Sequence, residues 1–376
     1  MDFHVEREPF LKALSRIQSV VERRNTMPVL GNVLLEVDGN TLTVTATDTE
    51  IALRSTMACE VTEPGGITLP AKKLYEIVRE LPDGAVRLRQ ATGERVIVTS
   101  ERARFTLFGI AAQLFPAIPQ PDGHQRITLE SLVMASLFNK VHFSMSQDDG
   151  RFVLNGIFLQ LDPATPEIPQ AFLRMVATDS HRLAMAETPI AGDNLDPRGV
   201  IIPRKAVIEA RKLLEEIQGQ TELIMGEKFL QFVMPDITMI TKLVEGRFPN
   251  WRRVIPEQNI HHLDTDKEVL LGVVRRMSVL SHEKSRSIHM EVRPNGLRVT
   301  TSNPEQEDAN EEMDSTGTTY TGPDLDLGFN AKYLQEILSC MDGETVRFHL
   351  LNDDASVLVT SVERGHFLFV LMPMRV

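Results

Sequence analysis

The sequence has very few cysteines and no long hydrophobic run. Cys59 and Cys340 are its two cysteines, so it can build neither a disulfide framework nor a metal cage from cysteine. No apolar stretch approaches the length of a helix that spans a bilayer. The first residues, Met1 to Arg7, contain neither a basic segment nor an apolar one, so we expect no signal peptide. These absences predict a cytoplasmic protein that needs no metal or other cofactor.

Acidic residues outnumber basic ones. The 376 residues include 40 Lys and Arg against 52 Asp and Glu, which gives a formal net charge of −12. Such a balance argues against a protein that coats nucleic acid with its whole surface, although a local basic face remains possible. Hydrophobic residues make up 42% and charged residues 24%, which is typical of a globular protein.

One pattern, an alternating strand that runs into a polar turn, occurs three times. It spans residues 42–50, 173–182 and 297–304, so the copies lie about 125 to 130 residues apart. A repeat of this length is a duplicated domain, and a third of the chain is large enough to bury its own core. The sequence turns polar near 121–123 and 256–261. We therefore predict three domains at 1–123, 124–256 and 257–376.

Each third has the same order of elements, with two amphipathic helices and two groups of strands. Apolar spacing predicts helices near 10–21, 74–81, 129–143, 203–219, 269–277 and 334–341. Alternation predicts strands at 3–5, 33–37, 42–46, 52–61, 86–90, 96–100, 104–109, 157–161, 172–178, 288–292 and 297–301. The resulting fold class is α+β, with helices on one face of antiparallel sheets.

Four motifs in order carry a resemblance that extends along the whole chain. They are Pro28 to Asn32, Ala177 to Ala184, Leu243 to Pro249 and Met372 to Val376. With the triplication, they make the chain similar to the beta subunits of bacterial DNA polymerase III, the replicative sliding clamps. The resemblance implies three clamp domains per subunit, closed head to tail as a homodimeric ring around duplex DNA. It also implies a nucleoid-associated cytoplasmic location and, as partners, the clamp loader and the replicative and repair polymerases.

Helix dimensions independently favour two chains per ring. Six helices side by side at ~9 to 10 Å, less ~10 Å of helix thickness, leave a hole of roughly 8 Å, narrower than the ~12 Å major groove. Twelve helices leave roughly 26 Å. The resemblance implies an apolar dimer contact between Phe105 and Val279–Leu280. Opposite charges could surround it, from Arg95, Arg102, Arg104, Glu305, Glu307 and Asp308.

Basic residues on or beside the predicted helices are candidates for contacts with DNA phosphates. Few aromatic residues interleave with them, so we expect them to hold the backbone without reading sequence. A solvated helix face is the alternative interpretation for any one of them. The candidates are Lys12, Arg16, Arg24, Lys72, Lys73, Arg79, Arg204, Lys205, Arg211, Lys212, Arg275, Arg276 and Lys332.

The resemblance further implies a pocket between the second and third domains that binds partner peptides. The matching residues are Leu154, Thr178, Ser180, His181, Arg182, Leu183, Pro249, Arg253, Val254, Asn330, Tyr333, Ser356, Val370, Leu371, Met372, Pro373, Met374, Arg375 and Val376. Ser180 replaces a glycine common in the family, Asp354 falls near an often apolar position, and Val376 replaces a terminal leucine. These departures affect the expected peptide affinity. We expect His181, Arg182, Arg253 and Ser356 at the pocket rim.

Two other functions compete with this interpretation. Asp179, Ser180 and His181 have the residue types of a hydrolase, but a serine next to its base cannot easily present its Oγ to the imidazole. No G-x-S-x-G motif surrounds them. The other alternative is a scaffold that binds peptides without encircling DNA. We expect a protein that is not an enzyme.

Overall fold

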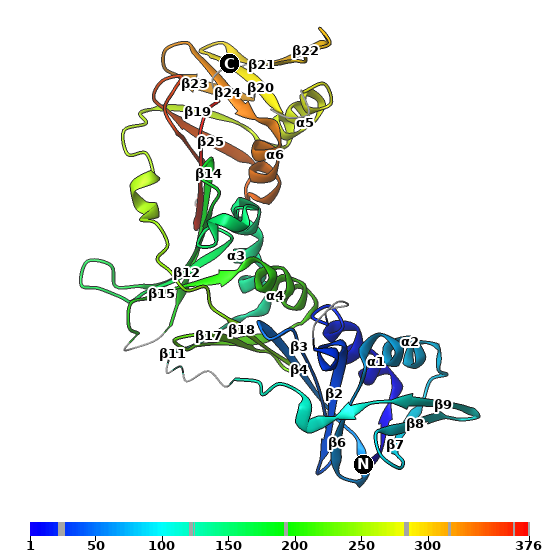
Figure 1. Ribbon diagram of the computed structural model, residues 1–376. Coiled ribbons are helices and arrows are strands. Elements are labelled where there is room, and N and C mark those ends of the chain that lie inside the picture. Colours follow the sequence, from blue (N-terminus) through cyan, green and yellow to red (C-terminus); the bar gives the residue numbers. More distant parts are fainter. Residues whose placement is uncertain are drawn as a thin grey trace. The chain divides into compact units, whose positions relative to one another are not determined.

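The protein, seen here as a computed structural model, divides into two compact units (Figure 1). Residues 1–21, 27–119, 123, 125–191, 195–281, 286–314, 317–363 and 365–374 are described. Unit 1 comprises Met1–Leu132 and Ile208–Leu243, and unit 2 comprises Val133–Val207 and Val244–Val376. The middle third of the chain, 124–256, therefore contributes to both units.

Unit 1 contains two antiparallel sheets. The first has the order β5-β1-β7-β8-β9, formed by Glu60–Glu63, Asp2–Glu6, Ala85–Gln90, Arg95–Ser100 and Ala103–Phe108. The second has the order β10-β6-β2-β3-β4-β18-β17-β16-β11. Its strands are Ile110–Ala111, Gly65–Pro70, Asn32–Asp38, Thr41–Thr47, Ile51–Ala58, Ile237–Lys242, Phe229–Val233, Gln220–Met225 and Gln125–Glu130. The pairing of β4 with β18 joins the first and middle thirds into one continuous sheet.

Unit 2 has the same arrangement. Its larger sheet has the order β15-β12-β13-β14-β27-β26-β25-β19-β23. These strands are Arg198–Pro203, Gly156–Asp162, Ala171–Thr178, Arg182–Ile190, Phe367–Leu371, Val357–Ser361, Thr345–Leu350, His261–Asp266 and Thr318–Thr321. The smaller sheet, β22-β21-β20-β24, is formed by Asp308–Asp314, Gly296–Ser302, Ser287–Arg293 and Leu325–Asn330. Here the pairing of β14 with β27 joins the middle and last thirds.

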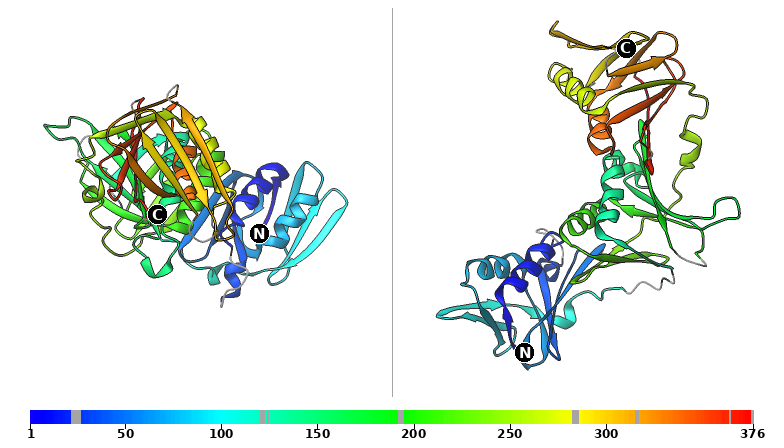
Figure 2. Two further views of the ribbon diagram at one scale, coloured as in Figure 1. Left: turned by 90° about the horizontal axis from the view of Figure 1, so that it is seen from above. Right: turned by 180° about the vertical axis from the view of Figure 1, so that it is seen from behind.

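All six predicted helices are present, two in each third. They are α1 Arg7–Ile17, α2 Ala71–Glu80, α3 Ser131–Val141, α4 Arg204–Glu216, α5 Lys267–Ser278 and α6 Ala331–Cys340. α1 packs against α2 and α5 against α6, and the turned views show these helices on one side of the sheets (Figure 2). Phe10, Leu14 and Ile17 form the buried stripe of α1. Burying each such side chain contributes about 2 kcal/mol. The predicted α+β class is confirmed.

The prediction of a single strand at 52–61 is wrong. The chain forms β4, breaks at the buried Cys59, and continues as β5 in the other sheet of unit 1. The amide of Cys59 donates to the carbonyl of Asn40, directly beyond the last residue pair of the β3–β4 ladder in the second sheet. Periodicity alone does not reveal this change of sheet, because both strands keep the same alternation.

Candidate peptide site and nucleic-acid interface

The turn between β13 and β14 is built by two side chains that hydrogen-bond its backbone. Asp179 Oδ1 accepts from the amides of His181, at 2.9 Å, and Arg182, at 3.0 Å. Thr178 Oγ1 accepts from the Ser180 amide at 3.2 Å and donates to the Arg182 carbonyl at 2.7 Å. Short polar side chains of this kind fix tight turns. Ser180 adopts a φ of 78°, in the left-handed region.

The first third contains the same turn. Asp48 Oδ1 accepts from the amides of Glu50, at 2.8 Å, and Ile51, at 2.7 Å. Thr47 Oγ1 accepts from Thr49, whose φ is also 78°. In the last third the turn is looser, with Asn303 accepting from the Glu307 amide at 3.0 Å. The repeat seen in the sequence is therefore a repeat of turn chemistry.

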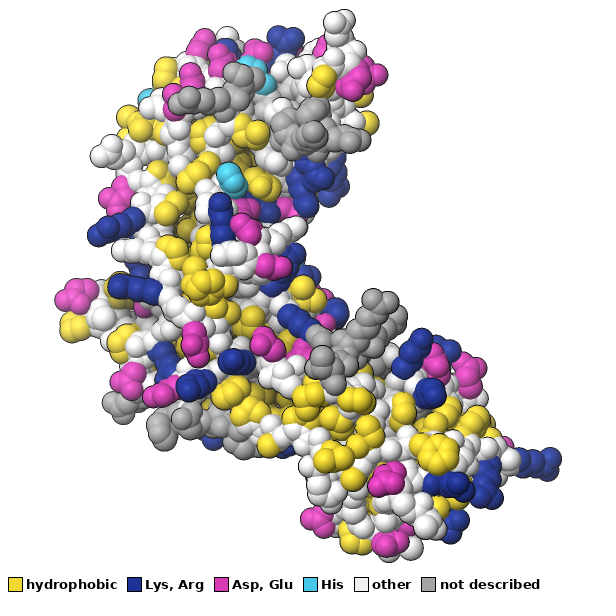
Figure 3. Space-filling view, in the orientation of Figure 1, with side chains coloured by type: hydrophobic (Ala, Val, Ile, Leu, Met, Phe, Trp, Pro, Cys, Tyr) yellow, Lys and Arg dark blue, Asp and Glu magenta, His cyan; other side chains and the backbone are white. Residues whose placement is uncertain are grey.

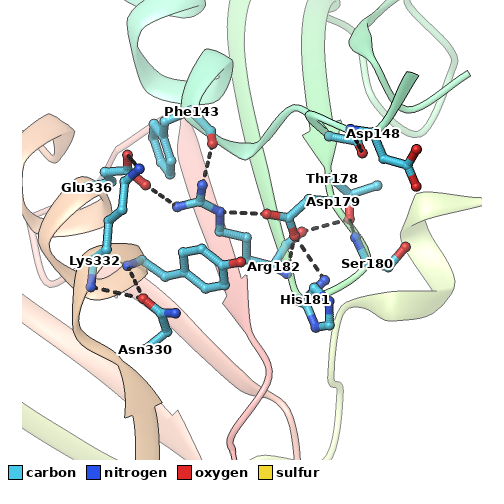
Figure 4. A network of polar contacts seen from close by, with 12 residues as sticks. Phe143, Asp148, Thr178, Asp179, Ser180, His181, Arg182, Asn330, Lys332 and Glu336 are labelled. Carbon is cyan, nitrogen blue, oxygen red and sulfur yellow. Dashed lines mark hydrogen bonds and ion pairs between the residues drawn. The ribbon is translucent and has the colours of Figure 1, made fainter. Parts of the chain in front are cut away.

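The buried Arg182 lies at the centre of a partly buried polar network in unit 2 (Figure 4). Its guanidinium bonds Asp179 at 3.1 Å, Glu336 of α6 at 2.5 Å, and the Phe143 carbonyl. It also stacks on the Tyr333 ring, 4.0 Å from the centroid. Arg182 thus links the middle third to the last third. We expected Arg182 at the rim of a pocket, but with 6% exposure it is buried and not at a rim.

An apolar cluster forms beside this turn. Leu154, Leu183 and Val370 of the predicted site pack together there. Residues outside the predicted pocket set complete the cluster, namely Val176, Met185, Ile201, Phe248 and Trp251. Phe248 stacks on Phe158 with ring centroids 4.9 Å apart. Figure 3 shows hydrophobic side chains gathered on the visible face of unit 2.

The other predicted pocket residues surround this cluster at different depths. Ser180, His181, Pro249, Arg253, Val254 and Met372 are exposed, Thr178, Asn330, Tyr333, Ser356, Pro373 and Met374 are half-buried, and Leu371 is buried. The Met372 amide donates to the His181 carbonyl at 3.0 Å, and the Met374 amide donates to Gly328 at 2.8 Å. The C-terminal segment is thereby fastened to the β13–β14 turn. Arg375 and Val376 lie outside the described residues.

Most of the predicted DNA contacts are exposed cations on the helices. Lys72, Lys205 and Lys332 are each the second residue of the second helix of their third, and all three are exposed. Lys72 and Lys332 lie 3.7 and 3.9 Å from the glutamate one turn on. Figure 3 shows Lys and Arg side chains gathered where α6 lies in unit 2. Of the others, Lys12, Lys73, Arg79, Lys212, Arg275 and Arg276 are exposed, and Arg204 and Arg211 are half-buried.

Two of the predicted DNA contacts need separate comment. Arg16 is 8% exposed, and its guanidinium binds Glu216 at 2.9 Å and Asp236 at 2.7 Å. A buried cation whose donors are already engaged is not available to a phosphate, so the prediction for Arg16 does not fit its position. The sequence placed Arg16 on a polar face and could not anticipate the two acids of the middle third that cover it. Arg24 lies outside the described residues.

Most of the residues predicted at a dimer joint lie on or beside β9 and β22, each the end strand of its sheet among the described residues. Phe105, Arg104 and the neighbouring Arg102 are exposed on or next to β9, and Asp308 begins β22, just after Glu305 and Glu307. Val279, directly after α5, is 79% exposed, and Leu280 is half-buried. Sequence reasoning missed Phe108, 67% exposed on β9 with Arg95 5.4 Å above its ring. A second aromatic in the segment 104–109 was the signal for it.

The geometry does not favour a hydrolase. Both carboxylate oxygens of Asp179 already accept hydrogen bonds, from the turn backbone and from the Arg182 guanidinium. The Ser180 hydroxyl accepts from Arg151 at 3.2 Å. Within the described residues, no group of three or more His, Cys, Asp or Glu side chains could hold a metal ion. Burial raises the pKa of the Cys340 thiol to about 12, so this thiol is not a nucleophile near neutral pH. In the described ranges, no helix is long and apolar enough to cross a membrane.

Three family models match the chain in succession. They are the N-terminal domain of the DNA polymerase III beta subunit at residues 1–119, its central domain at 128–250 and its C-terminal domain at 252–375. The fold is therefore that of the DNA clamps, with three repeated domains in one chain. The chain belongs to the DNA polymerase III beta subunit family, and its function is that of a DNA sliding clamp. Clamps of this family are not enzymes.

Individual relatives agree along their whole length. The chain is 36% identical to the beta sliding clamp of Pseudomonas aeruginosa and 37% identical to that of Escherichia coli K12, each over 376 residues and all of both chains. A crystal structure of the DNA polymerase III subunit beta from P. aeruginosa superposes with a TM-score of 0.94 at 36% identity, covering all of both chains. The clamp of Caulobacter crescentus, solved with polyethylene glycol at a putative tethering region, gives the same TM-score and coverage at 36% identity.

Proposed function

We propose that two copies of the chain close head to tail into a ring around duplex DNA. The observation that carries this proposal is the identical joining of successive thirds. In unit 1, β4 pairs with β18 from Ile51↔Thr241 to Ser55↔Ile237. In unit 2, β14 pairs with β27 from Arg182↔Leu371 to Ala186↔Phe367. Each ladder pairs five consecutive residues, and its first residue, Ile51 or Arg182, lies three positions after the aspartate of the preceding turn.

Two edge strands of the same kinds remain. β22 corresponds to β4 and β14, since each follows the strand that runs into the repeated turn. β9 corresponds to β18 and β27, since each is the third strand after the second helix of its third. Among the described residues, β22 pairs only with β21 and β9 only with β8. An unpaired edge is a template for another strand. Pairing β22 with β9 of a second copy makes a third junction of the same design, and two such joints close a two-fold ring.

Side chains at these edges support the pairing. Phe105 on β9 and Val279 after α5 offer exposed apolar area at the two ends. The arginines at positions 95, 102 and 104 complement the acids at 305, 307 and 308, as at the polar rim of a specific interface. We therefore expect the pair of substitutions Val279→Ala and Leu280→Ala to give folded monomers. An intact dimer at low micromolar concentration in sedimentation velocity would contradict the joint.

The helices supply the proposed surface for DNA. The lysine at the second position of α2, α4 and α6 gives each third a cation at the same place, so a six-domain ring presents six. The other exposed cations of the predicted set join them, without the buried Arg16 and without Arg276, whose guanidinium is held by Glu311. Glutamates one turn away weaken the attraction, which suits a ring that slides, because topology and not affinity keeps it on DNA.

The apolar cluster of unit 2 is the proposed site for partner peptides, which include segments of the clamp loader and of replicative and repair polymerases. A short segment would place bulky apolar side chains against Leu183, Val254 and Met372, with His181 and Arg253 at the rim. A flexible peptide must be ordered on binding, so we expect micromolar affinity, about −8 kcal/mol. We propose the domain limits 1–123, 124–256 and 257–376 and a location in the cytoplasm at the nucleoid.

Removing residues 372–376 tests the peptide site. It deletes Met372, whose amide is bonded to His181, and should weaken binding of a clamp-binding peptide more than about tenfold, or ~1.4 kcal/mol. Fluorescence anisotropy measures the affinity, and sedimentation checks that the dimer persists. Unchanged peptide affinity would show that the site lies elsewhere.

A further inference from the structure

The first helix of each third carries a cation at the same position. Arg16, Lys140 and Arg276 are the tenth residues of α1, α3 and α5. Lys140 was not among the residues singled out from sequence. The three cations have the same place in the fold, but their surroundings differ.

At the two junctions inside the chain, this cation is buried and paired with the following third. Arg16 binds Glu216, the last residue of α4, and its Nη1 binds Asp236 in the β17–β18 turn at 2.7 Å. Lys140 binds Asp342, which follows α6, at 2.8 Å. Arg16 and Lys140 are each 8% exposed. A buried cation must be paired, so each of them secures one junction.

Arg276 has no following third in its own chain. Its side chain is 57% exposed, and it is held by Glu311 of β22 through Nε at 2.8 Å and Nη2 at 2.5 Å. The hydrogen bonds with Arg276 lower the pKa of Glu311. Arg276 Nη1 bonds no acid among the described residues. The same atom of Arg16 binds Asp236.

Glu311 occupies a strand position that holds a small side chain at the other two junctions. It lies opposite Val299 on β21. The corresponding residues are Ser55, opposite Val44, and Ala186, opposite Met175. Neither can form an ion pair with the cation of its own third. Glu311 therefore fixes the direction of Arg276 while no neighbour is present.

The first third of a second copy has an acid where the first junction has Asp236. Asp236 lies in the turn between β17 and β18, and Glu101 lies in the corresponding turn between β8 and β9, where it is exposed. The other corresponding acid, Glu80 at the end of α2, is already bonded to Arg79 at 2.9 Å. We propose that Arg276 is the cation of the joint between subunits, oriented by Glu311 and binding Glu101 of the partner subunit. This inference rests on the proposed ring.

Charge exchange tests it, with the dimer dissociation constant measured by sedimentation equilibrium. Arg276→Glu should raise the dissociation constant about a hundredfold. The ring has two joints, and in each of them the loss of the ion pair and the repulsion between the introduced glutamate and Glu101 should weaken binding about tenfold. Glu101→Arg should weaken the dimer likewise. The double variant, Arg276→Glu with Glu101→Arg, should return to within about tenfold of the wild type.

Arg298→Glu is the matched control, since Arg298 lies on β21 and pairs with Glu291 and Glu312 of its own sheet. It should leave the dissociation constant unchanged. If Arg276→Glu lowers the thermal midpoint, Arg276→Gln replaces it in the same measurement. Equal constants for the Arg276 and Arg298 variants, or no recovery in the double variant, would overturn the inference while the ring stands. A wild-type chain that stays monomeric would overturn the ring itself.

Discussion

Ser180 and Thr49 hold a left-handed backbone conformation that suits glycine. Both have a φ of 78° at the same place in two copies of the turn. For a residue with a Cβ this conformation costs about 1 to 2 kcal/mol. Substitution by glycine removes that strain but costs about 0.5 to 1 kcal/mol, because glycine loses more conformational entropy on folding. The side-chain bonds from Asp48 and Asp179 offset the remaining strain.

Ser180→Gly should therefore stabilise the protein by about 0.5 to 1 kcal/mol. Chemical denaturation measures the change, and Thr49→Gly should behave similarly. Ser302→Gly, at an exposed end of β21 with an ordinary backbone, is the control and should be neutral or destabilising. A loss of stability in Ser180→Gly would mean that the hydroxyl, which accepts from Arg151, outweighs the strain.

His349 makes unit 2 sensitive to mild acid. Burial, with His262 and Arg347 nearby, lowers the pKa of His349 to about 4, and its Nε2 lies 2.9 Å from the Thr360 hydroxyl. In the unfolded chain the imidazole titrates near 6.5. The unfolded state thus binds more protons between pH 6.5 and 4, and stability falls as the pH is lowered through that range.

His349→Gln should flatten this dependence. We expect the loss between pH 6.5 and 4 to shrink by about 1 to 2 kcal/mol, allowing for partial solvent screening. Thermal unfolding across the pH series measures it. An unchanged slope would assign the acid sensitivity to the carboxylates.

At the scale of elements, the helices begin in different ways. Asp266 caps α5 by accepting from the Val269 amide at 2.8 Å, whereas Glu6 precedes α1 without a capping side-chain bond. Asp266→Ala should cost about 1 kcal/mol of stability, and Glu6→Ala should cost little. Comparing the denaturation midpoints of the two variants tests the cap, and equal losses would refute it.

The sequence predicts where helices and strands lie better than it predicts which residues they contact in the fold. All six helices follow from apolar spacing, because a buried stripe such as Phe10, Leu14 and Ile17 is a local signal. The break at Cys59 and the burial of Arg16 and Arg182 were missed. Each depends on residues far along the chain, such as Asp236 for Arg16 and Glu336 for Arg182, which no local pattern reveals.

The candidate site shows the same division. The strand-to-turn pattern located the turn at Thr178 to Leu183, since its hydrogen bonds are local, and only the resemblance assigned that turn to a peptide site. Phe248 and Trp251, which complete the apolar cluster, join it only through tertiary packing. Their positions after β18 gave no periodic signal.

At the scale of the whole molecule, the account depends on one rule of assembly that is used at every junction. Two junctions within the chain join sheets edge to edge in the same register. The proposed third junction, between subunits, would pair β22 with β9, which are end strands of their sheets in the described chain. Enclosure of DNA then requires no strong contact with phosphate, which agrees with a chain of net charge −12.

Retention on circular and linear DNA tests that enclosure most directly. The clamp is loaded on nicked circular DNA with a bacterial clamp loader, and the complex is washed with salt concentrated enough to strip phosphate contacts. We predict that the ring stays on the circle through the wash and is lost when a restriction enzyme linearises the DNA. Equal retention on circular and linear DNA, or loss from the circle in salt, would contradict a topological hold.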